Sequence, residues 1–518
     1  MKRRRIAVRK ICTEVCRRTS RGQTTVFLSL VLVLIVSLVC TLLEAARSEA
    51  LRLRLQVTAD ASLSSAFAMY DRQVWDRYGL LMFADRKGDA EEFKETIERY
   101  AQLNACMPDG PGGDWTAFSG AEAADLKYVL MTDDHGEVFM QAVVTYMKEC
   151  GLILEIRDLS ETWDGVMDSV GAMSLINADG ELDLDSIGSI LENINDGIKD
   201  AVEIQTGGNG TPDGDDAAET SGDVSTAEAL EIMEGMTQNL WNWKRRGLLM
   251  AVCDNVMQVS EKTISAEGLP SSLGDNERSR RAGEEMEHSL TDDLILREYA
   301  LTHLNSYRDK PGEMLELEYL AAGKNSDLAN LASVAKRLIA VRTALNVIFL
   351  ETHSDYKAEI TAVAAAIAVF AGGEGAIDGI RTILEVLWGL AEAVSDVRTL
   401  MCGGNVVLIK GPEDWKLSLR NAALSGFGES ADTGGMDYRD YMRLLLYIRS
   451  SETLAYRMMD CIQLYAQKED GDFRMQDCIY AARVSLLGRS GPLFPFLPEE
   501  ISYSLGADSS FSYGKISY

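Results

Sequence analysis

The first strong pattern along the chain is an unbroken apolar run near the N-terminus. Residues 23–43 carry no charged side chain, and about 20 such residues are enough for a helix to cross the hydrocarbon core of a bilayer. In lipid, backbone polar groups must be paired within the segment, so we predict a single transmembrane helix here. A cleaved signal peptide is the alternative, because it also begins with basic residues followed by an apolar run.

The pattern stays helical beyond the apolar run. Residues 44–69 contain no Gly or Pro, and we predict that the transmembrane helix continues outward through them as a stalk helix. Its apolar positions recur at helical spacing: Leu51, Leu55, Ala59, Leu63 and Phe67. This stripe must pack either on the chain's own ectodomain or on a partner subunit. The first four of these residues are our candidates for partner binding.

Beyond the stalk, the pattern predicts a first ectodomain lobe over residues 70–205. A helix is expected to end at Gly79 and to lead into a short strand near Phe83, with further helices to about residue 160. Residues 206–226 are polar and rich in glycine and aspartate, a composition that cannot bury enough apolar surface to fold. We therefore predict a disordered linker there.

The remaining residues, 227–518, are assigned to a second lobe. Apolar and acidic residues alternate over 314–321, which predicts a half-buried strand, and a short strand is expected at 406–410. Helices are expected over 327–350, 360–371, 380–400 and 438–466. The predicted class is α+β, dominated by helix, with two lobes outside the membrane.

Two features of this lobe leave alternatives. The apolar run 360–371 is about half the length needed to span a bilayer, so we predict a buried core helix, with membrane contact as the alternative. At the C-terminus, Ile501, Tyr503 and Leu505 alternate with polar residues before the sequence GlyAlaAspSerSer, and Phe511 and Tyr513 follow. This pattern predicts a terminal β-hairpin with its turn at 506–510.

The charge distribution orients the predicted transmembrane helix. Residues 1–22 contain nine Lys or Arg residues against one acid, whereas the whole chain has a net charge of −29. Basic flanks stay in the cytoplasm, so we expect residues 1–22 to be a cytoplasmic tail and the part beyond the membrane to be extracellular. That outer part is strongly acidic, which argues against nucleic-acid binding.

Nine cysteines are spread along the chain without a metal-binding arrangement. Cys12 and Cys16 lie one helical turn apart, but no second Cys or His pair accompanies them to complete a zinc site. In an oxidising compartment a disulfide such as Cys461 with Cys478 is one option, and the sequence alone does not decide it.

Residues typical of catalysis or metal binding are scarce. The four histidines, His135, His288, His303 and His353, have no metal-ligand spacing, and neither a GlyXxxSerXxxGly elbow nor a phosphate-binding loop is present. The acidic run Asp179–Asp185 invites calcium but has Leu where a binding loop needs Gly, so a solvated turn is favoured. We expect no enzymatic activity, no cofactor and no small-molecule substrate.

About the first seventy residues combine several features in a fixed order. They are ArgGlyGlnThrThrValPheLeuSerLeu, the apolar run, an acid at its outer end, an Arg-studded helix, and a GlnXxxXxxAlaAspAla motif at Gln56, Ala59, Asp60 and Ala61. This layout resembles the TadE/TadG-like proteins of Flp pilus assembly. In that family Gly22 would be a prepilin-type processing site. However, cleaved pilin-like subunits place Glu five residues after the cleaved Gly, where this chain has Phe27. The resemblance therefore implies an accessory component instead of a major filament subunit.

The rest of the chain resembles a poorly characterised family of large membrane-anchored proteins from anaerobic Gram-positive bacteria. The similar passages are residues 70–81, 317–331, 391–400 and 437–443, and the resemblance implies no known activity. The leading hypothesis is a structural or assembly component of a Tad/Flp-type pilus or related secretion apparatus, whose partners are the lipid bilayer and other envelope proteins. The alternative is a membrane-tethered extracellular binding protein unrelated to pili.

Overall fold

The computed structural model describes residues 2–105, 115–151, 177, 180–192, 225–254, 256–273, 289–369, 374–425, 432–494 and 503–514. The chain forms two compact units, which we call the N-terminal unit (Met1–Asp133, Asn276–Met286 and Asp470–Tyr518) and the helical unit (Asp134–Asp275 and Glu287–Glu469). The fold is α+β and dominated by helix, as predicted.

The division between the units differs from the predicted one. We expected the boundary at the linker 206–226, of which residues 206–224 lie outside the described residues. Instead, the boundaries fall at Asp133 and Glu469, because the C-terminal segment pairs with strands of the N-terminal unit. Strand pairing between residues far apart in sequence is not visible in local hydrophobic periodicity.

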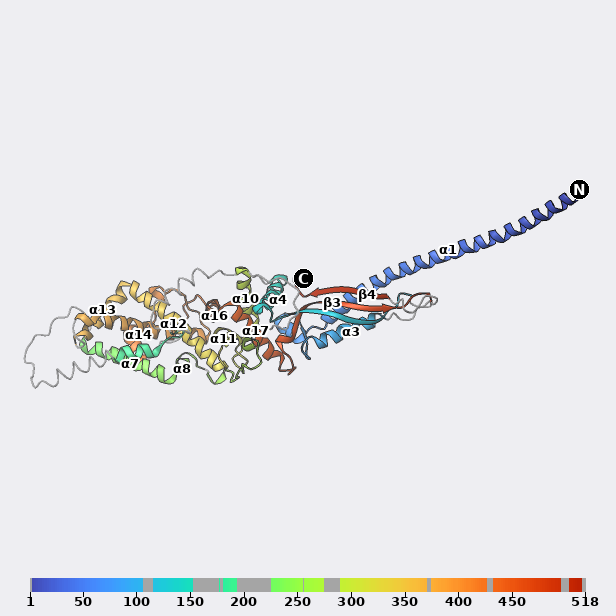
Figure 1. Cartoon of the computed structure of the whole chain (residues 1–518). Helices are drawn as coiled ribbons and strands as arrows, with labels where there is room; N and C mark the ends of the chain where they lie inside the picture. The colour runs from blue at the N-terminus through green and yellow to red at the C-terminus, as the bar shows by residue number, and fades with distance from the viewer. Residues whose placement is uncertain are drawn as a thin grey trace, which may run out of the picture. The chain divides into compact units, whose positions relative to one another are not determined.

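The N-terminal unit is built on one long helix, α1 (Lys2–Phe67), which runs without a break from the basic tail to the end of the predicted stalk (Figure 1). Continuation of the apolar run as a stalk helix is thereby confirmed. After α1, Asp71 caps α2 (Arg72–Tyr78), and Gly79 ends it in the left-handed conformation before the short strand β1 (Phe83–Ala84), as predicted.

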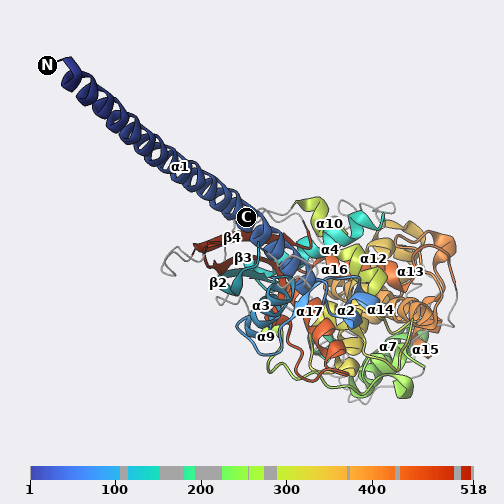
Figure 2. The same cartoon turned by 90° about the vertical axis from the view of Figure 1, so that its right-hand side faces the viewer.

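Four antiparallel strands form the sheet of this unit. The central strand is β3 (Cys478–Ser490), which pairs with β1, with β2 (Ser119–Leu130) and with β4 (Tyr503–Ser512). The inner half of α1 packs on β3 and β4, while α3 (Glu91–Ala105) packs on β2 and on α1 (Figure 2). The core of the unit is the apolar layer between these two helices and the sheet.

The C-terminal hairpin was predicted with the wrong turn. Residues 506–510 lie inside β4 and pair with Arg483–Leu487 of β3, so the hairpin consists of β3 and β4. Leu505, Ala507 and Ser509 all point inward, beneath α1. The small residues fit the space under the helix, which is why a sequence that looks like a turn is a strand here. Strand β2 was not predicted.

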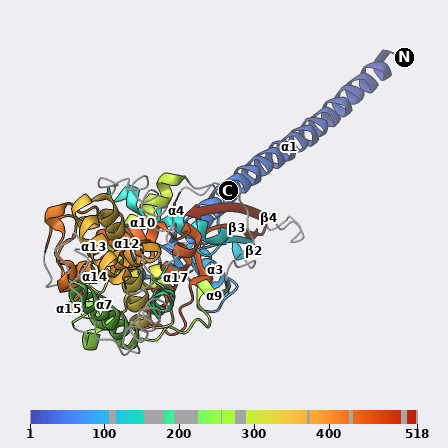
Figure 3. The same ribbon diagram turned by 90° about the vertical axis from the view of Figure 1, so that its left-hand side faces the viewer.

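The helical unit contains the long helices α12 (Asp327–Thr352), α13 (Ser354–Ala368) and α14 (Ile377–Cys402), confirming three predicted helices (Figure 3). Helices α12 and α14 cross closely, since a Cβ atom at Gly389 would lie 3.0 Å from a methyl group of Val347. Around them lie α4 (Glu137–Glu149), α7 (Thr226–Arg246), α8 (Leu249–Val252), α9 (Pro270–Leu273), α10 (Leu290–His303) and α15 (Leu419–Ser425).

Three elements of this unit differ from the predictions. The expected strand at 314–321 is a helix, α11 (Glu316–Ala322), because its acidic side chains are buried along with the apolar ones. The expected helix 438–466 is split into α16 (Tyr438–Tyr447) and α17 (Ser451–Ala466), since Ser450 caps a new helix. The expected strand at 406–410 is reduced to a single bridge between Val406 and Met436.

Candidate functional site

The outer part of α1 has the properties of a membrane-spanning segment. In the described part of the chain, α1 is the single helix that is long and apolar enough to cross a bilayer. The most apolar stretch of α1 is not buried in the fold at all. The hydroxyl groups of Ser29, Ser37 and Thr41 donate to carbonyl oxygens three residues earlier in the same helix. These polar groups are therefore satisfied without water, as a lipid environment requires.

A polar cluster marks the point where α1 enters the fold. We call it the junction: Glu44, Arg47, Trp115, Ser490, Gly491 and Leu493. The Arg47 guanidinium donates to the carbonyl oxygens of Trp115 at 2.6 Å and Gly491 at 2.7 Å and to the Ser490 hydroxyl at 2.9 Å, and it pairs with the Glu44 carboxylate at 3.3 Å. Glu44 also accepts from the backbone N–H of Leu493 at 3.3 Å. Both charged side chains are buried, and these contacts fix α1 to one end of the sheet.

The predicted partner-binding residues lie inside the N-terminal unit. Leu51, Leu55, Ala59 and Leu63 have no exposed surface and pack against the sheet and α3. Gly488 of β3 makes room for this contact, since a Cβ atom there would lie 3.2 Å from a methyl group of Leu55. The partner-binding assignment is therefore corrected: the stripe packs inside the N-terminal unit of the same chain, because the C-terminal hairpin returns to cover it.

The opposite face of α1 carries two exposed apolar residues in the predicted stalk. Leu53 is 68% exposed and Val57 is 59% exposed, and residues four positions apart lie next to each other on a helix. Sequence reasoning missed this pair because the longer stripe on the other face gave the stronger periodic signal.

The motif residues behind the pilus-assembly resemblance also have structural roles. Gln56 donates to the Asp508 carbonyl oxygen of β4 at 2.8 Å and to the Asp60 carboxylate at 3.1 Å, while Ala59 is buried against the core. The motif thus contributes to seating α1 on the sheet. Gly22 lies within α1, and the structure describes no side-chain environment at that level of the helix.

A charged cluster is buried at the centre of the helical unit. We call it the core ion cluster: Arg342, Glu392, Asp396 and Lys410, all at most 6% exposed. Arg342 donates to Asp396 at 2.8 and 3.0 Å, and Lys410 lies 2.8 Å from the other Asp396 oxygen and bonds to Glu392. Two positive charges are thus balanced by two negative ones.

The surroundings shift the pKa values of Asp396 and Glu392 in opposite directions. Burial alone would raise the pKa of Asp396, but Arg342 and Lys410 outweigh it and hold that pKa below its usual range. For Glu392, burial dominates over the attraction of Lys410 and raises the pKa. Glu392 also accepts from the backbone N–H groups of Lys416 and Leu417, so the cluster ties α14 to the following loop.

The sequence carried part of this signal. Glu392 and Asp396 stand one turn apart in α14, a helix whose other buried positions are largely apolar. Acids at core positions require buried partners. Lys410, which lies beyond the end of α14, could not be identified as one from sequence.

A second buried acid lies in α11. Glu318 has no exposed surface, and one of its carboxylate oxygens accepts from the Tyr307 N–H at 2.9 Å and from the Tyr438 hydroxyl at 2.8 Å. Its other oxygen has no hydrogen-bond partner among the described residues. Burial raises the pKa of Glu318 to about 7.

This pKa predicts a pH dependence of stability. The folded chain keeps the proton on Glu318 up to about pH 7, whereas the unfolded chain loses it near the ordinary glutamate pKa of 4.5. The contribution is fully present below about pH 4.5 and is lost as pH rises through 7, by up to about 3 kcal/mol. Glu318→Gln should remove that part of the slope in urea unfolding measured at about pH 5 and pH 7.5. The exposed Glu231→Gln is the control, and an unchanged slope in Glu318→Gln would refute the assignment.

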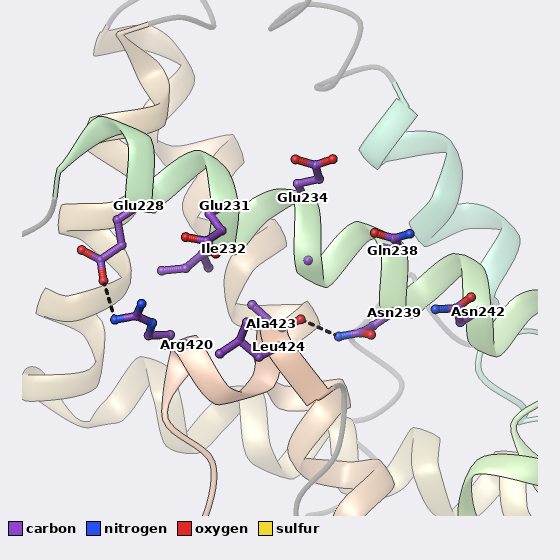
Figure 4. A pocket seen from close by; sticks show the side chains of 11 residues that line it. Glu228, Glu231, Ile232, Glu234, Gln238, Asn239, Asn242, Arg420, Ala423 and Leu424 are labelled. Atoms are coloured by element: carbon purple, nitrogen blue, oxygen red, sulfur yellow. Dashed lines mark hydrogen bonds and ion pairs between the residues drawn. The ribbon is translucent and has the colours of Figure 1, made fainter.

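A surface groove of about 390 Å³ lies between α7 and α15 (Figure 4). Glu228, Glu231 and Glu234 project from α7, and Glu228 pairs with Arg420 of α15 at 3.4 Å. Asn239 donates to the carbonyl oxygens of Ala422 and Ala423, joining the two helices at the floor. The described residues that line the groove include no Ser, Thr, Cys, Lys or His side chain.

The histidines and the acidic run, which the sequence offers as candidates for catalysis or metal binding, do not come together in one site within the described part of the chain. His303 stacks on Tyr299, His353 stacks on Phe349, and His135 lies 3.4 Å from Glu452, while His288 is outside the described residues. In the acidic run, Glu181 accepts from Ser333, Asp183 accepts from Ser186, and Asp185 pairs with Lys244; Asp179 is outside the described residues. No group of metal-binding side chains occurs within the described ranges.

The disulfide suggested by the sequence is not formed. Cys461 lies in α17 of the helical unit and Cys478 begins β3 of the N-terminal unit, and both are buried thiols outside any disulfide. Burial raises the pKa of the Cys478 thiol, which disfavours the reactive thiolate form.

Comparison with known proteins gives one match. No curated protein and no solved structure matches the chain. The model of a family of unknown function, DUF5702, matches residues 227–489, from α7 through nearly all of β3, and so includes the core ion cluster, Glu318 and the groove. Because this match covers half of the sequence, the chain belongs to the DUF5702 family.

Proposed function

We propose that the protein is a non-enzymatic, membrane-anchored structural or assembly component of a Tad/Flp-type pilus or a related secretion apparatus. The observation that carries the proposal is the continuity of α1. Its residues 24–43 form an exposed apolar segment, and its residues 51–67 contribute the buried stripe to the core of the N-terminal unit. No linker separates anchor from fold. A force or displacement on the anchor therefore passes directly to the sheet, which suits a structural part of an assembly.

The outward face of α1 is the surface we assign to other subunits. Leu53 and Val57 continue the apolar character of the membrane segment on the side of the helix that faces away from the sheet. If the membrane helix of another subunit packs along the apolar segment of α1, the part of that helix outside the membrane would contact Leu53 and Val57. The N-terminal resemblance to TadE/TadG-like proteins supports pilus-type subunits as these neighbours.

The proposed topology places residues 1–22 in the cytoplasm and both units outside. Protease added to intact spheroplasts is expected to digest the chain beyond Glu44 and to leave the basic tail protected, since positive flanks remain inside. Epitopes at the two ends of the chain, read by immunoblotting, measure this. Protection of an epitope at Tyr518 would contradict the orientation, and detergent-permeabilised cells provide the control for protease access.

The assembly role is tested by isolating the full chain from its native membranes with a photo-reactive residue in place of Leu53. We expect cross-links to pilin-like subunits or to the platform protein of a pilus system, and adjacent genes that encode a pilus ATPase. The absence of both the cross-links and such neighbouring genes would refute the pilus assignment. A photo-reactive residue in place of Glu267, which is exposed in the helical unit and lies outside the groove between α7 and α15, controls for nonspecific capture.

A membrane-tethered extracellular binding protein is the second candidate. The groove between α7 and α15 is the observation that favours it, because a concave surface lined by acids and amides can hold a polar ligand. Cross-links that centre on this groove instead of on α1 would favour the second candidate.

A further inference from the structure

The junction lies at the depth where the membrane surface must be, given the anchoring proposed above. The exposed apolar segment spans residues 24–43, and twenty helical residues measure about 30 Å, the thickness of the hydrocarbon core. Leu43 is therefore at the outer edge of that core. Glu44 is the next residue and Arg47 follows one turn later.

The contacts of these two side chains fix the depth of the sheet's end. Side chains on a helix lean toward its N-terminus, which in α1 is the direction of the membrane. Glu44 holds the N–H of Leu493, and Arg47 holds the carbonyl oxygens of Gly491 and Trp115. The backbone at 115 and 491–493 thus lies within about one helical turn, ~5 Å, of the level of Leu43. The polar layer of a bilayer is about 5 to 8 Å thick on each side.

The side chains at this end suit that layer. Trp115 is 51% exposed, and Pro492, Leu493 and Phe494 are partly exposed and uncharged. Tryptophan is enriched at membrane interfaces, because its ring prefers the apolar side and its N–H the wet side. The two charged groups, Glu44 and Arg47, are buried and paired with each other. A single exposed tryptophan is ordinary on a soluble protein, so exposure alone does not indicate contact with a membrane. Contact is indicated because Trp115 lies near the level of Leu43, where the hydrocarbon core ends.

We propose that the sheet end formed by Trp115 and residues 491–494 rests in the outer headgroup layer of the lipid bilayer. The N-terminal unit then has two contacts with the membrane, the spanning segment of α1 and this sheet end. Two contacts restrict the tilt of α1, because a change of tilt that moves the sheet end outward would lift it from the lipid. The exposed face at Leu53 and Val57 is thereby held at a constant height above the bilayer.

The test uses the full chain in lipid nanodiscs whose acyl chains carry bromine near the headgroup, a short-range quencher of tryptophan fluorescence. Emission of Trp115 is obtained as the difference between the wild type and Trp115→Phe, each in brominated and unbrominated discs. Trp75→Phe is the matched control, since Trp75 is partly exposed in the same unit but lies beyond the far end of α1. Twenty-four helical residues, about 36 Å, separate Leu43 from that end.

We expect bromine to remove most of the Trp115 emission and to leave the Trp75 emission unchanged. Equal emission of Trp115 in both kinds of disc would overturn the proposal. Anchoring is read separately, from co-elution of the chain with the discs. A chain that elutes with the discs but has an unquenched Trp115 would overturn only the contact of the sheet end. A chain that does not elute with the discs would refute the anchoring and this proposal together.

Discussion

Replacing Arg342 with Met is expected to destabilise the helical unit by about 3 to 5 kcal/mol, the usual cost of removing one partner from a buried ion pair. The change leaves Asp396 and Glu392 against Lys410 alone, so one buried negative charge is uncompensated. Asp396 would also lose both bonds from the guanidinium. Hydrogen exchange in peptides of α12 and α14 measures the effect locally, which is needed because a chain of two units need not unfold in one step.

Two matched variants make this result interpretable. Arg439→Met removes an exposed arginine that pairs with Asp309 at 2.9 Å, and we expect it to cost at most about 1 kcal/mol. The double variant Arg342→Met with Asp396→Leu removes one charge of each sign, so it should recover part of the loss. If Arg342→Met and Arg439→Met had equal effects, the core ion cluster would not support the fold as we describe.

Leu55→Asp should destabilise the N-terminal unit strongly and Leu53→Asp hardly at all, although the two residues lie two positions apart on α1. Leu55 is fully buried against the sheet, so an aspartate there should cost more than the about 2 to 5 kcal/mol of a buried leucine truncation. Leu53 is exposed, and its replacement should change the stability of the N-terminal unit by no more than about 0.5 kcal/mol. The two variants are distinguished by thermal unfolding of the full chain in detergent, with hydrogen exchange of the β3 amides as the readout.

The same pair separates folding from assembly. If the outward face of α1 binds another subunit, Leu53→Asp should keep its melting temperature and lose its complexes in membranes. Leu55→Asp should lose both, since an unfolded unit cannot present α1 correctly. Retention of all complexes by a folded Leu53→Asp chain would remove the outward face from the proposed function and leave the fold unaffected.

Several features of the fold were predictable because their signals are local. A charge-free run of membrane length, the helical period that continues after it, and glycine at the end of α2 are each read within a few turns of chain. Most of the long helices of the helical unit were found for the same reason. The errors in element type arose where local patterns are ambiguous: buried glutamates in α11 resemble the polar side of a strand, and the small residues of β4 resemble a turn.

The sequence by itself determined an apolar helix long enough to cross a membrane, the continuation of that helix, the α+β class and the presence of an apolar stripe that had to be covered. Tertiary structure alone decided what covers that stripe, because β3 and β4 come from a segment more than 400 residues away. It likewise brought Lys410 to the acids of α14 and Leu493 to Glu44. Hydrophobic periodicity states which face of a helix must be buried, but it contains no information on which distant segment will bury it.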